Sequence, residues 1–489
     1  MPSGSYIDGA WFTPASERRI ANVNPADTRD VIDEFPAATA ADLERAVQGA
    51  VAAQRGWAAT PAPARGRVLA RAVEVARRRK EEIARTMTRE QGKVLREARG
   101  EVDKGIAVLE FYAGEGFRMG GRTLPCELPD VFTYTIRRPL GVVGLITPWN
   151  FPWAIPVWKT APALVAGNAV IIKPAELTPA TCGLMVEVFE EAGLPPGVLQ
   201  MLVGPGREVG SALVDHAAVR AISFTGSNQI GINLYSQAAR RGAKVTCEMG
   251  GKNAVIVLAD ADVDAVAAAV INGAFGSTGQ RCTATSRLLV HQDVAGALTE
   301  AVVEGARRLK VGPGLDEASQ MGPAVDEKQL RQDLSYIDIG KQEGARLLTG
   351  GGRPAGLDHG FFVEPTVFGD VRPGSRLFQE EVFGPVLAVT TIKDLDEGIR
   401  LANAVEFGLT SSLFSRDVRA CMRFVEEVET GMVHVNEATV GGEAQLPFGG
   451  MKSTGVGERE MGEEGLRFFT EQKTVFINSS GGAARAFIR

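Results

Sequence analysis

The sequence predicts an α/β protein in which two doubly wound units follow one another along the chain. The chain has 489 residues, more than the ~250–300 that one hydrophobic core supports, so at least two domains are expected. Short apolar runs alternate with helical patterns, which is typical of a parallel sheet covered by helices on both faces. The alternation starts again after Arg287 and predicts the second unit.

Helical patterns dominate the N-terminal part of the chain. The capping-box pattern Thr39-x-x-Asp42 opens a helix over 39–57, in which apolar residues recur at helical spacing. A long charged helix is expected over 64–99, with Gly100 just past its end, because glycine commonly follows the last turn of a helix.

Short apolar runs predict the strands of the first sheet. Between two of them, Thr178-Pro179 marks a helix start, with a hydroxyl N-cap and proline in the first turn, and Gly193 marks the end of that helix. The runs are the strand-like TYTIRRPLGVVG (133–144), VVGLI (142–146), AVIIK (169–173), VLQMLVG (198–204), AISFTG (221–226), KVTCEMG (244–250) and AVIVL (254–258).

The second unit shows the same alternation. Its strand candidates are RLLV (287–290), RLLTGG (346–351), SSLFS (411–415) and MVHVN (432–436), and its helix candidates are 295–309, 327–343, 395–407 and 418–430. A late strand, KTVFI (473–477), has no later strand to pair with. Two interpretations stay open: it is added to a sheet of a neighbouring subunit, or it is an ordinary edge strand.

Composition and charge exclude several classes of protein. The net charge is −6 and there is no run of basic residues, so nucleic acid is not an expected partner. The five cysteines form no C-x-x-C pair and the four histidines lie far apart, so we expect neither a disulfide framework nor a metal site. No apolar stretch is long enough for a membrane span and the N-terminus lacks signal-peptide features, so a cytoplasmic protein is expected.

One cysteine stands in a setting that favours reactivity. The segment GSTGQRCTATSR (276–287) surrounds Cys282 with small and polar residues, and Arg281 is adjacent. A neighbouring positive charge lowers the pKa of a thiol, and the thiolate is the nucleophile. The alternative is a surface thiol without a role. A phosphatase-type loop is disfavoured, because only four residues separate Cys282 from Arg287.

Two further side chains are candidates for the same chemistry. Glu248 ends a strand, where active residues of open α/β folds gather, and a glutamate in an apolar site can act as a general base. Asn150, in the proline-bracketed segment TPWNFP, offers a rigid amide to a developing oxyanion. The plain alternatives are a helix-capping or surface glutamate and an asparagine that stabilises its own turn.

Three segments after strands suggest a dinucleotide site. KPAE (173–176) offers Lys173 and Glu176 to the ribose hydroxyls, and FTGSNQIG (224–231) opens a helix whose backbone N–H groups can hold a pyrophosphate. VGPGREVG (203–210) is glycine-rich without being a G-x-G-x-x-G motif. Each segment taken alone is also compatible with a plain strand-to-helix turn.

Together and in this order, the motifs TPWNFP, KPAE, FTGS, E-x-GGKN, GQRC, EEVFGP and PFGGMKSTGVG resemble the NAD(P)-dependent aldehyde dehydrogenase superfamily over nearly the whole chain. The resemblance implies that Cys282 is the nucleophile and that Glu248 is the general base. It implies that Asn150 and the backbone N–H of Cys282 form the oxyanion hole, and it places Lys159 near the catalytic centre.

The resemblance also implies the cofactor and its contacts. NAD is expected because the carboxylate of Glu176 would repel a 2′-phosphate, whereas Lys173 could still tolerate NADP. The implied cofactor-binding residues are Thr147, Trp149, Lys173, Glu176, Gly206, Phe224, Gly226, Ser227, Glu381 and Phe383.

The family fold implies two Rossmann-like doubly wound domains and a small β oligomerisation extension. The cofactor domain would comprise 1–122 and 141–251, the catalytic domain 252–449, and the extension 123–140 and 466–489. A homo-oligomer, dimer or tetramer, is therefore expected. The implied reaction oxidises an aldehyde to a carboxylic acid through a cysteine thioester, which water activated by Glu248 hydrolyses.

The substrate is predicted from smaller likenesses. WAIPVWKTAPAL (153–164) and GQRCTATSR (279–287) resemble the α-ketoglutaric semialdehyde dehydrogenase branch, which implies a short carboxylated semialdehyde. Arg281 would bind its carboxylate or form a structural salt bridge, and Trp153 and Trp158 would line a tunnel or pack in the core. Aromatic or aliphatic aldehydes and a catalytically silent homologue remain alternatives. A coenzyme A-acylating enzyme is disfavoured, because that branch lacks the Glu248 base.

Overall fold

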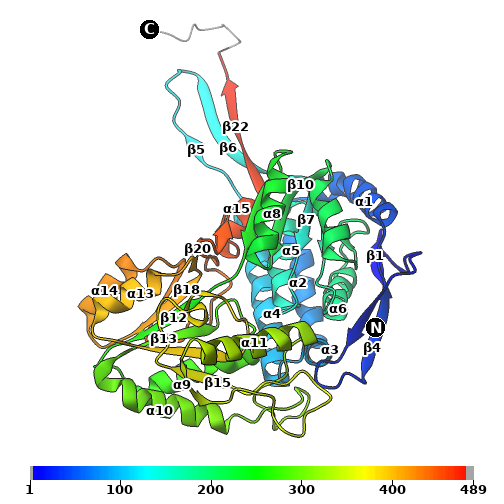
Figure 1. The fold of residues 1–489 in the computed structure, drawn as a ribbon. Coiled ribbons are helices and arrows are strands. Elements are labelled where there is room, and N and C mark those ends of the chain that lie inside the picture. The colour runs from blue at the N-terminus through cyan, green and yellow to red at the C-terminus, as the bar shows by residue number, and fades with distance from the viewer. Residues whose placement is uncertain (1–3, 481–489) are drawn as a thin grey trace.

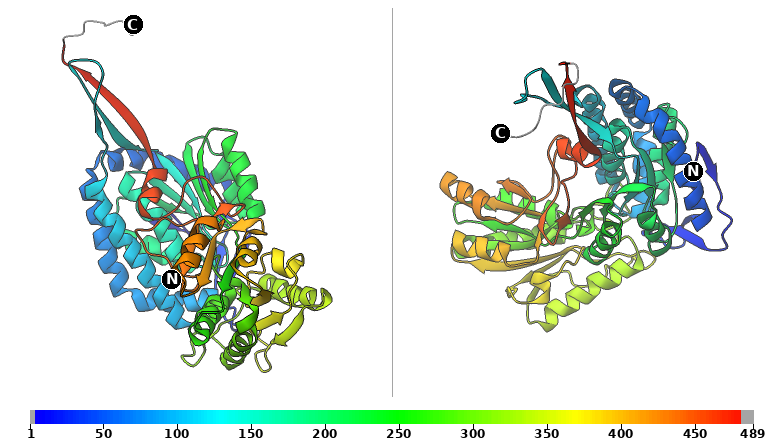
Figure 2. Two further views of the ribbon diagram at one scale, coloured as in Figure 1. Left: turned by 90° about the vertical axis from the view of Figure 1, so that its left-hand side faces the viewer. Right: turned by 90° about the horizontal axis from the view of Figure 1, so that it is seen from above.

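The computed structural model describes residues 4–480 and builds them around two large sheets (Figure 1). Within these residues, the first sheet has eight strands in the order β2-β1-β9-β8-β7-β10-β11-β21, and the second has seven in the order β14-β15-β16-β13-β12-β18-β19. Helices cover both faces of the first sheet, and a three-stranded arm projects from the body (Figures 1 and 2).

The carboxyl ends of the central strands lie on the same side of the first sheet. Strands β7, β8, β10 and β11 are parallel neighbours, so the residues that follow them lie side by side. Every residue of β7 and β8 is buried, as their continuous apolar runs predicted. The strands are β1 (Ser5–Ile7), β2 (Ala10–Phe12), β7 (Val142–Ile146), β8 (Ala169–Lys173), β9 (Leu199–Met201), β10 (Val219–Thr225), β11 (Lys244–Glu248) and β21 (Gly455–Val456).

The helix predicted after Thr39 is confirmed. Thr39 caps α1, where its hydroxyl accepts the backbone N–H of Asp42 at 3.2 Å and the Asp42 carboxylate accepts the N–H of Thr39 at 2.8 Å. The helices around the first sheet are α1 (Ala40–Ala59), α2 (Ala62–Arg78), α3 (Lys80–Gln91), α4 (Leu95–Arg118), α5 (Ala154–Ala166), α6 (Pro179–Glu191), α7 (Ser211–Asp215) and α8 (Asn228–Ala239), with a π-helical turn at η1 (Gly206–Gly210).

The single charged helix predicted over 64–99 is wrong, because the structure has α2, α3 and the start of α4 there. The chain turns at Gly92, whose φ of 98° is left-handed and ends α3. Gly100, predicted as a helix end, lies inside α4, where an added Cβ would meet no described atom within 4 Å. Amphipathic periodicity continues through all three helices, so the pattern did not show the breaks.

The start of α6 is placed as predicted, but its cap differs. Thr178 precedes Pro179, yet within residues 4–480 its hydroxyl makes no capping hydrogen bond. The carboxylate of Glu90, from α3, accepts the N–H groups of Ala180 and Thr181 at 2.7 and 2.9 Å instead. A buried carboxylate therefore satisfies the free N–H groups that a hydroxyl was expected to satisfy.

The second sheet is parallel except for β14, which pairs antiparallel with β15. The helix predicted over 395–407 ends earlier, because Phe407 belongs to a short strand. The strands are β12 (Asn253–Val257), β13 (Thr285–His291), β14 (Arg346–Thr349), β15 (Thr366–Gly369), β16 (Val386–Ile392), β18 (Thr410–Phe414) and β19 (Met432–Val435). The helices are α9 (Val263–Phe275), η2 (Gly276–Gly279), α10 (Gln292–Arg308), α11 (Glu327–Gln342), α12 (Arg376–Gln379), α13 (Leu395–Asn403) and α14 (Val418–Glu427). Helix α15 (Gly462–Phe468) instead packs against α5, in the core of the first domain.

The arm is formed by segments far apart in the sequence. Strand β22 (Thr470–Asn478) pairs antiparallel with β6 (Val131–Pro139) along its whole length, and β5 (Thr123–Leu124) lies on the other side of β6. The late strand thus has a partner earlier in its own chain. Within the described residues the other edge of β22 is open, and Phe476, a residue of this strand, is 68% exposed. Residues 481–489 of the predicted extension lie outside the described residues, as do residues 1–3.

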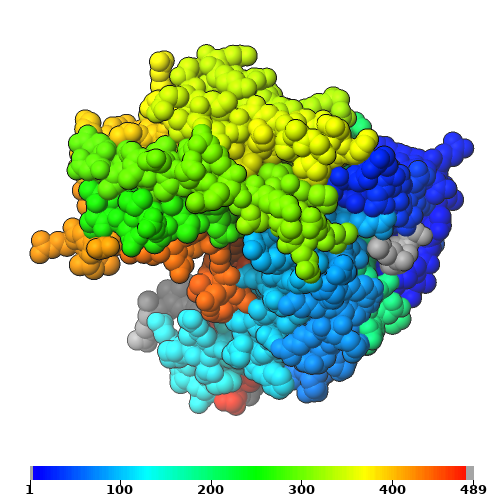
Figure 3. All heavy atoms as spheres, turned by 90° about the horizontal axis from the view of Figure 1, so that it is seen from below, coloured from blue at the N-terminus to red at the C-terminus, as the bar shows by residue number. Residues whose placement is uncertain are grey.

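The two domains share a broad contact. Figure 3 shows segments of the second domain, green to yellow, packed against N-terminal segments in blue. Backbone hydrogen bonds join them, from Leu95 to Gly314 at 2.9 Å and from Thr28 to His359 at 2.8 Å. Two short ribbons complete the described secondary structure, β3 (Arg19–Val23) with β4 (Val31–Pro36) and β17 (Phe407–Gly408) with β20 (Met451–Lys452). Among residues 4–480, no helix is long and apolar enough to cross a membrane.

Candidate active site

The three predicted catalytic residues meet where the two domains join. Asn150 follows β7, Glu248 ends β11, and Cys282 follows η2 in the second domain. The Asn150 side-chain amide donates to the carbonyl of Gln280 at 3.0 Å, and Asn253 donates to the carbonyl of Cys282 at 2.8 Å. Hydrogen bonds therefore tie the cysteine loop both to the asparagine loop and to the first residue of β12.

The turn before Cys282 is strained. Ser277 and Thr278 have φ values of 50° and 60°, and Gly279 follows at 67°. Left-handed backbone at non-glycine residues costs ~1–3 kcal/mol each and persists only where the surroundings enforce it. At Gly279 an added Cβ would lie 2.3 Å from the carbonyl oxygen of Gly384, so only glycine fits between the two loops. Packing therefore fixes the approach of the chain to Cys282.

The electrostatic setting of Cys282 differs from the prediction. Burial, followed by the negative charges of Glu248 and Glu381, raises the pKa of the thiol to about 12. The expected lowering by Arg281 is wrong, because that guanidinium is directed to Glu97 at 3.1 Å. Because the charges that act on the thiol, those of Glu248 and Glu381, are negative, a base must take the thiol proton or a cationic ligand must lower the pKa.

Arg281 is part of the framework. Its side chain is 14% exposed, pairs with Glu97 of α4 and donates to the Ser277 hydroxyl at 3.1 Å. The Glu97 carboxylate also accepts the backbone N–H of Ser277 at 2.8 Å. Of the two interpretations, the structure supports the structural salt bridge, and binding of a substrate carboxylate by this guanidinium is not supported.

Glu248 is buried and incompletely satisfied, as a general base requires. It is 4% exposed, and one of its carboxylate oxygens has no hydrogen-bond partner within residues 4–480. Burial, and then the charge of Glu460, raises its pKa well above the ordinary value, while Lys159 opposes the shift. At Gly449 an added Cβ would lie 2.4 Å from the other oxygen, so this glycine makes room for the carboxylate.

Lys159 is close to this base but has its own partner. Its ammonium group forms a buried ion pair with Glu460 and donates to the Ser223 hydroxyl at 2.7 Å. The Trp158 indole donates to the same Glu460 carboxylate at 2.7 Å. Sequence reasoning missed Glu460, because a glutamate shortly after the last recognised motif carries no distinguishing signal.

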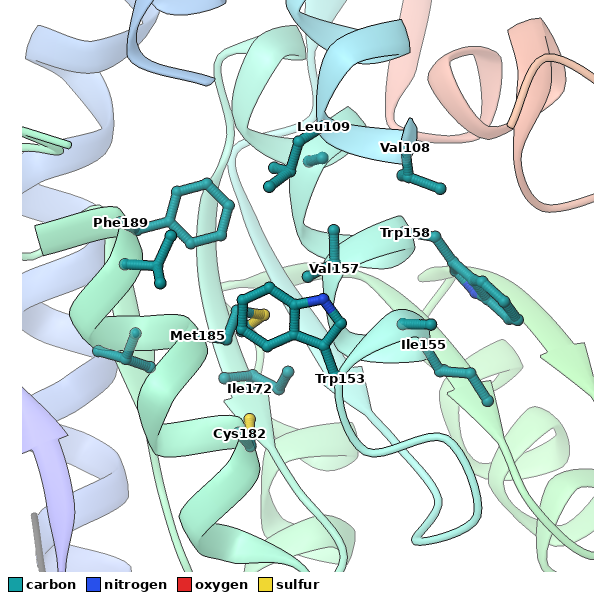
Figure 4. Packing of buried hydrophobic residues seen from close by; sticks show 14 of the residues in the cluster. Val108, Leu109, Trp153, Ile155, Val157, Trp158, Ile172, Cys182, Met185 and Phe189 are labelled. Carbon is teal, nitrogen blue, oxygen red and sulfur yellow. The ribbon is translucent and has the colours of Figure 1, made fainter. Parts of the chain in front are cut away.

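The two tryptophans proposed for a substrate tunnel are core residues. Trp153 is 0% exposed and lies among Val157, Ile172, Met185 and Phe189 (Figure 4). Its indole also packs over a glycine of α4, where an added Cβ would lie 2.2 Å from its Nε1. Trp158 is 8% exposed and is held by its hydrogen bond to the glutamate named above. Core packing, the other interpretation of the sequence, is supported for both tryptophans.

The predicted ribose contacts lie at and after the carboxyl end of β8. Lys173 is buried, donates to the carbonyl of Pro174 at 3.0 Å, and has its pKa lowered to about 8 by burial. Glu176 accepts the backbone N–H of Gly206 at 3.0 Å. The hydroxyl of Thr147 is buried and unpartnered among the described residues, so it is available to a ligand.

The predicted pyrophosphate turn has the expected form. The N–H of Gly226 donates to the carbonyl of Glu248 at 3.1 Å, and an added Cβ would lie 2.5 Å from the ring of Phe224. Ser227 is exposed at the N-cap of α8, where its side chain makes no capping bond within residues 4–480. The first N–H groups of this twelve-residue helix are thus placed to bind an anion.

The predicted nicotinamide contacts lie beside the cysteine loop. Glu381 accepts the N–H of Gly251 at 2.8 Å, and burial raises the pKa of its carboxyl to about 7. Phe383 has a left-handed φ of 61°, and its ring meets the ring of Trp149 edge-on at 5.4 Å between centroids. The structure therefore gathers the residues expected to hold a dinucleotide along one edge that leads to Cys282.

Comparisons with known proteins show the family of the chain. A sequence profile of the aldehyde dehydrogenase family matches residues 11–475. Alpha-ketoglutaric semialdehyde dehydrogenase of Bacillus subtilis is 45% identical over 475 residues, which cover 97% of each chain. 2,5-Dioxopentanoate dehydrogenase of Saccharolobus solfataricus is 44% identical over 97% of this chain and 99% of its own.

Solved structures confirm the predicted fold class. Betaine aldehyde dehydrogenase of Staphylococcus aureus, solved in complex with NAD+, superposes with a TM-score of 0.96 at 33% identity, covering 100% of this chain and 97% of its own. A putative aldehyde dehydrogenase of Burkholderia cenocepacia superposes with a TM-score of 0.97 at 36% identity and covers 100% of both chains. Since sequence and structure match over nearly the whole length, the chain belongs to the aldehyde dehydrogenase family.

Proposed function

We propose that this aldehyde dehydrogenase oxidises a short semialdehyde that carries a carboxylate, with α-ketoglutaric semialdehyde as the leading candidate. One observation carries the choice of substrate. Relatives from Bacillus subtilis, Saccharolobus solfataricus and Haloferax volcanii, named for this semialdehyde or its synonym 2,5-dioxopentanoate, are 44–45% identical over 97% of the chain. Plant aminoaldehyde dehydrogenases are 40–41% identical, so a cationic aldehyde is the second candidate.

The proposed chemistry assigns one role to each of three side chains. The sulfur of Cys282 attacks the aldehyde carbon, and the oxygen that becomes negative is stabilised by the amide of Asn150 and the backbone N–H of Cys282. Glu248, whose pKa is raised by burial and by the charge of Glu460, then takes a proton from the water that hydrolyses the thioester. The thioester arises when the adduct gives up its hydride to the cofactor, so the products are the carboxylic acid, the reduced cofactor, a proton and the free thiol.

The strand-edge residues fit NAD. Thr147, whose hydroxyl is unpartnered among the described residues, and the buried Lys173 would bind the adenosine end, and the first turn of α8, after Ser227, would bind the pyrophosphate. Glu176 disfavours a 2′-phosphate by charge, so NAD is proposed over NADP. When bound, NAD supplies a cationic nicotinamide ring that accepts the hydride of the aldehyde. Glu381 and Phe383 would hold that end beside the cysteine loop.

We further propose that the chain is a homo-oligomer through its arm. The open edge of β22 and the exposed side chains of Phe476 and Ile477, at 68% and 49%, favour pairing with a strand of a second copy. Sedimentation of the purified chain, with and without the substitution Phe476→Glu, tests the proposed contact.

The substrate proposal is tested with a panel of aldehydes. We expect kcat/KM for α-ketoglutaric semialdehyde to exceed the values for hexanal, benzaldehyde and 4-aminobutanal by at least about tenfold, which is ~1.4 kcal/mol of differential transition-state binding. NADH absorbance gives the rates. A higher kcat/KM for 4-aminobutanal would replace the proposal with the aminoaldehyde candidate, and a higher value for hexanal or benzaldehyde would contradict both.

A further inference from the structure

A fully buried ion pair lies behind the asparagine loop. Lys93, between α3 and α4, pairs with Glu101 in the second turn of α4, and both side chains are 1% exposed. Burying two charges costs several kcal/mol per ion before their attraction and hydrogen bonds offset it. Neither side chain has a part in the chemistry described above, so the pair needs another explanation.

Both members of the pair bind the backbone of the loop that carries Asn150. The Lys93 ammonium donates to the carbonyl oxygen of Asn150 at 2.7 Å and lies 4.2 Å from the centroid of the Phe151 ring. The other oxygen of the Glu101 carboxylate accepts the backbone N–H groups of Trp153 and Ala154 at 2.9 and 3.0 Å. The loop is therefore held at Asn150 itself and at the first residues of α5.

We propose that Lys93 and Glu101 are positioning residues, which fix the peptide of Asn150 so that its side-chain amide is aimed at the oxyanion formed over Cys282. This inference rests on the proposed role of Asn150. The amide already donates one N–H to the carbonyl of Gln280, two residues before the nucleophile, at 3.0 Å. With the backbone clamped and one N–H used, the direction of the second N–H is set before the substrate arrives.

The competing explanation is that the pair only stabilises the fold. The chain offers a matched control for this, because Glu90 of α3 caps a neighbouring helix in the same way. Glu90 is 1% exposed and accepts the N–H groups of Ala180 and Thr181 at the start of α6. It has no contact with the Asn150 loop among its described hydrogen bonds, which otherwise come from Asn22 and the Thr181 hydroxyl.

The test is a double-mutant cycle between Glu101→Gln and Asn150→Ala. The probe is p-nitrophenyl acetate, since thiol attack on this ester builds an oxyanion and releases p-nitrophenolate without any cofactor. We expect Asn150→Ala to slow acylation by ~10²–10³-fold. Glu101→Gln should slow it about tenfold in the native background but less than about twofold in the Asn150→Ala background, because groups that act through one another are not additive.

The control and the opposite outcome are equally specific. Glu90→Gln should change the acylation rate by the same factor in both backgrounds. An equal factor for Glu101→Gln in both backgrounds would overturn the inference and leave the pair with a purely structural role. Lys93→Met should reproduce the result for Glu101→Gln, because it removes the bond to the Asn150 carbonyl.

Two further outcomes are distinguished by design. If a single substitution prevents folding by leaving one buried charge alone, the neutral double variant Lys93→Met/Glu101→Gln takes its place in the cycle, with the same expected non-additivity. If Asn150→Ala acylates at the native rate, the oxyanion role of Asn150 falls, and this inference falls with it. If only the Glu101 factor is equal in both backgrounds, the inference alone fails and the proposed function stands.

Discussion

Glu248 and Glu101 are two buried glutamates near one catalytic centre, and their surroundings are opposite. As whole residues, Glu248 is 4% and Glu101 is 3% exposed. One oxygen of Glu248 has no partner among residues 4–480, whereas both oxygens of Glu101 are hydrogen-bonded. Burial, followed by the negative charge of Glu460, raises the pKa of Glu248, and the single backbone N–H that it accepts, from Gly450, does not offset this rise. The comparison teaches that burial alone does not make a base, because the hydrogen-bond donors around a carboxylate decide whether it acts or holds.

Glu97 extends the comparison along α4. It lies one helical turn before Glu101, and it binds the N–H of Ser277 at 2.8 Å and the guanidinium of Arg281 at 3.1 Å. Two carboxylates of one helix therefore hold the two loops of the site, Glu97 the nucleophile loop and Glu101 the oxyanion loop. Helix α4 belongs to the first domain, so Glu97 also fixes the second domain against it.

The largest expected effect comes from substituting Cys282, the proposed nucleophile. Cys282→Ala should abolish aldehyde oxidation, because no thioester can form without the thiol. The hydrogen bonds of Glu97 and Glu101 to the two loops should remain. NAD affinity, measured by calorimetry, should stay unchanged. Mass spectrometry should find an acyl adduct on the 276–287 segment of the native enzyme, quenched during turnover, and none on the variant. Native turnover by the variant would refute the assignment of the nucleophile.

The next largest effect separates the acting from the holding glutamate. Glu248→Gln should retain a rapid NADH burst but slow steady-state turnover by ~10²–10⁴-fold, since only thioester hydrolysis needs the base. Glu101→Gln should instead slow the burst. Stopped-flow absorbance resolves the two phases. A lost burst in Glu248→Gln would mean that this carboxylate also takes part in acylation, for example as the base for the thiol.

The rate of thioester hydrolysis should change about tenfold per pH unit below the pKa of Glu248, which gives a third way to tell this glutamate from Glu101. The pKa of Glu248 lies well above the ordinary value, so the basic form is lost as the pH falls through that raised pKa. Thioester hydrolysis should therefore increase with pH and level off above it. Single-turnover hydrolysis from pH 5 to 9 measures this, and the dependence should disappear in Glu248→Gln. A flat native profile would contradict the raised pKa.

The smallest expected effect concerns Arg281, the partner of Glu97 in the ion pair. Arg281→Ala should lower kcat/KM by about fivefold, or ~1 kcal/mol, and by the same factor for α-ketoglutaric semialdehyde and hexanal, because the guanidinium holds the loop through Glu97 and Ser277. Arg281→Lys should recover part of the loss. A loss confined to the carboxylated substrate would restore the interpretation in which Arg281 pairs with the substrate.

Sequence patterns were most informative where an element is locally determined. The capping box at Thr39, the apolar strands after residue 141 and the family motifs with Asn150, Glu248 and Cys282 could be read directly, since each depends on neighbouring residues. The breaks between α2, α3 and α4 could not, because amphipathic periodicity is the same on both sides of Gly92. Trp153 was ambiguous for a related reason, since a tryptophan in an apolar run suits both a tunnel and a core.

The sequence by itself determined the α/β class and the family, and it singled out the three side chains proposed for the chemistry, because these depend on residue types in a fixed order. Tertiary structure alone decided which charged side chains meet. It assigned Arg281 to Glu97, Lys159 to Glu460 and Lys93 to Glu101, partners that lie from 8 to 301 residues apart. Ion pairs depend on distance and desolvation in the folded state, and neither quantity is written in local sequence.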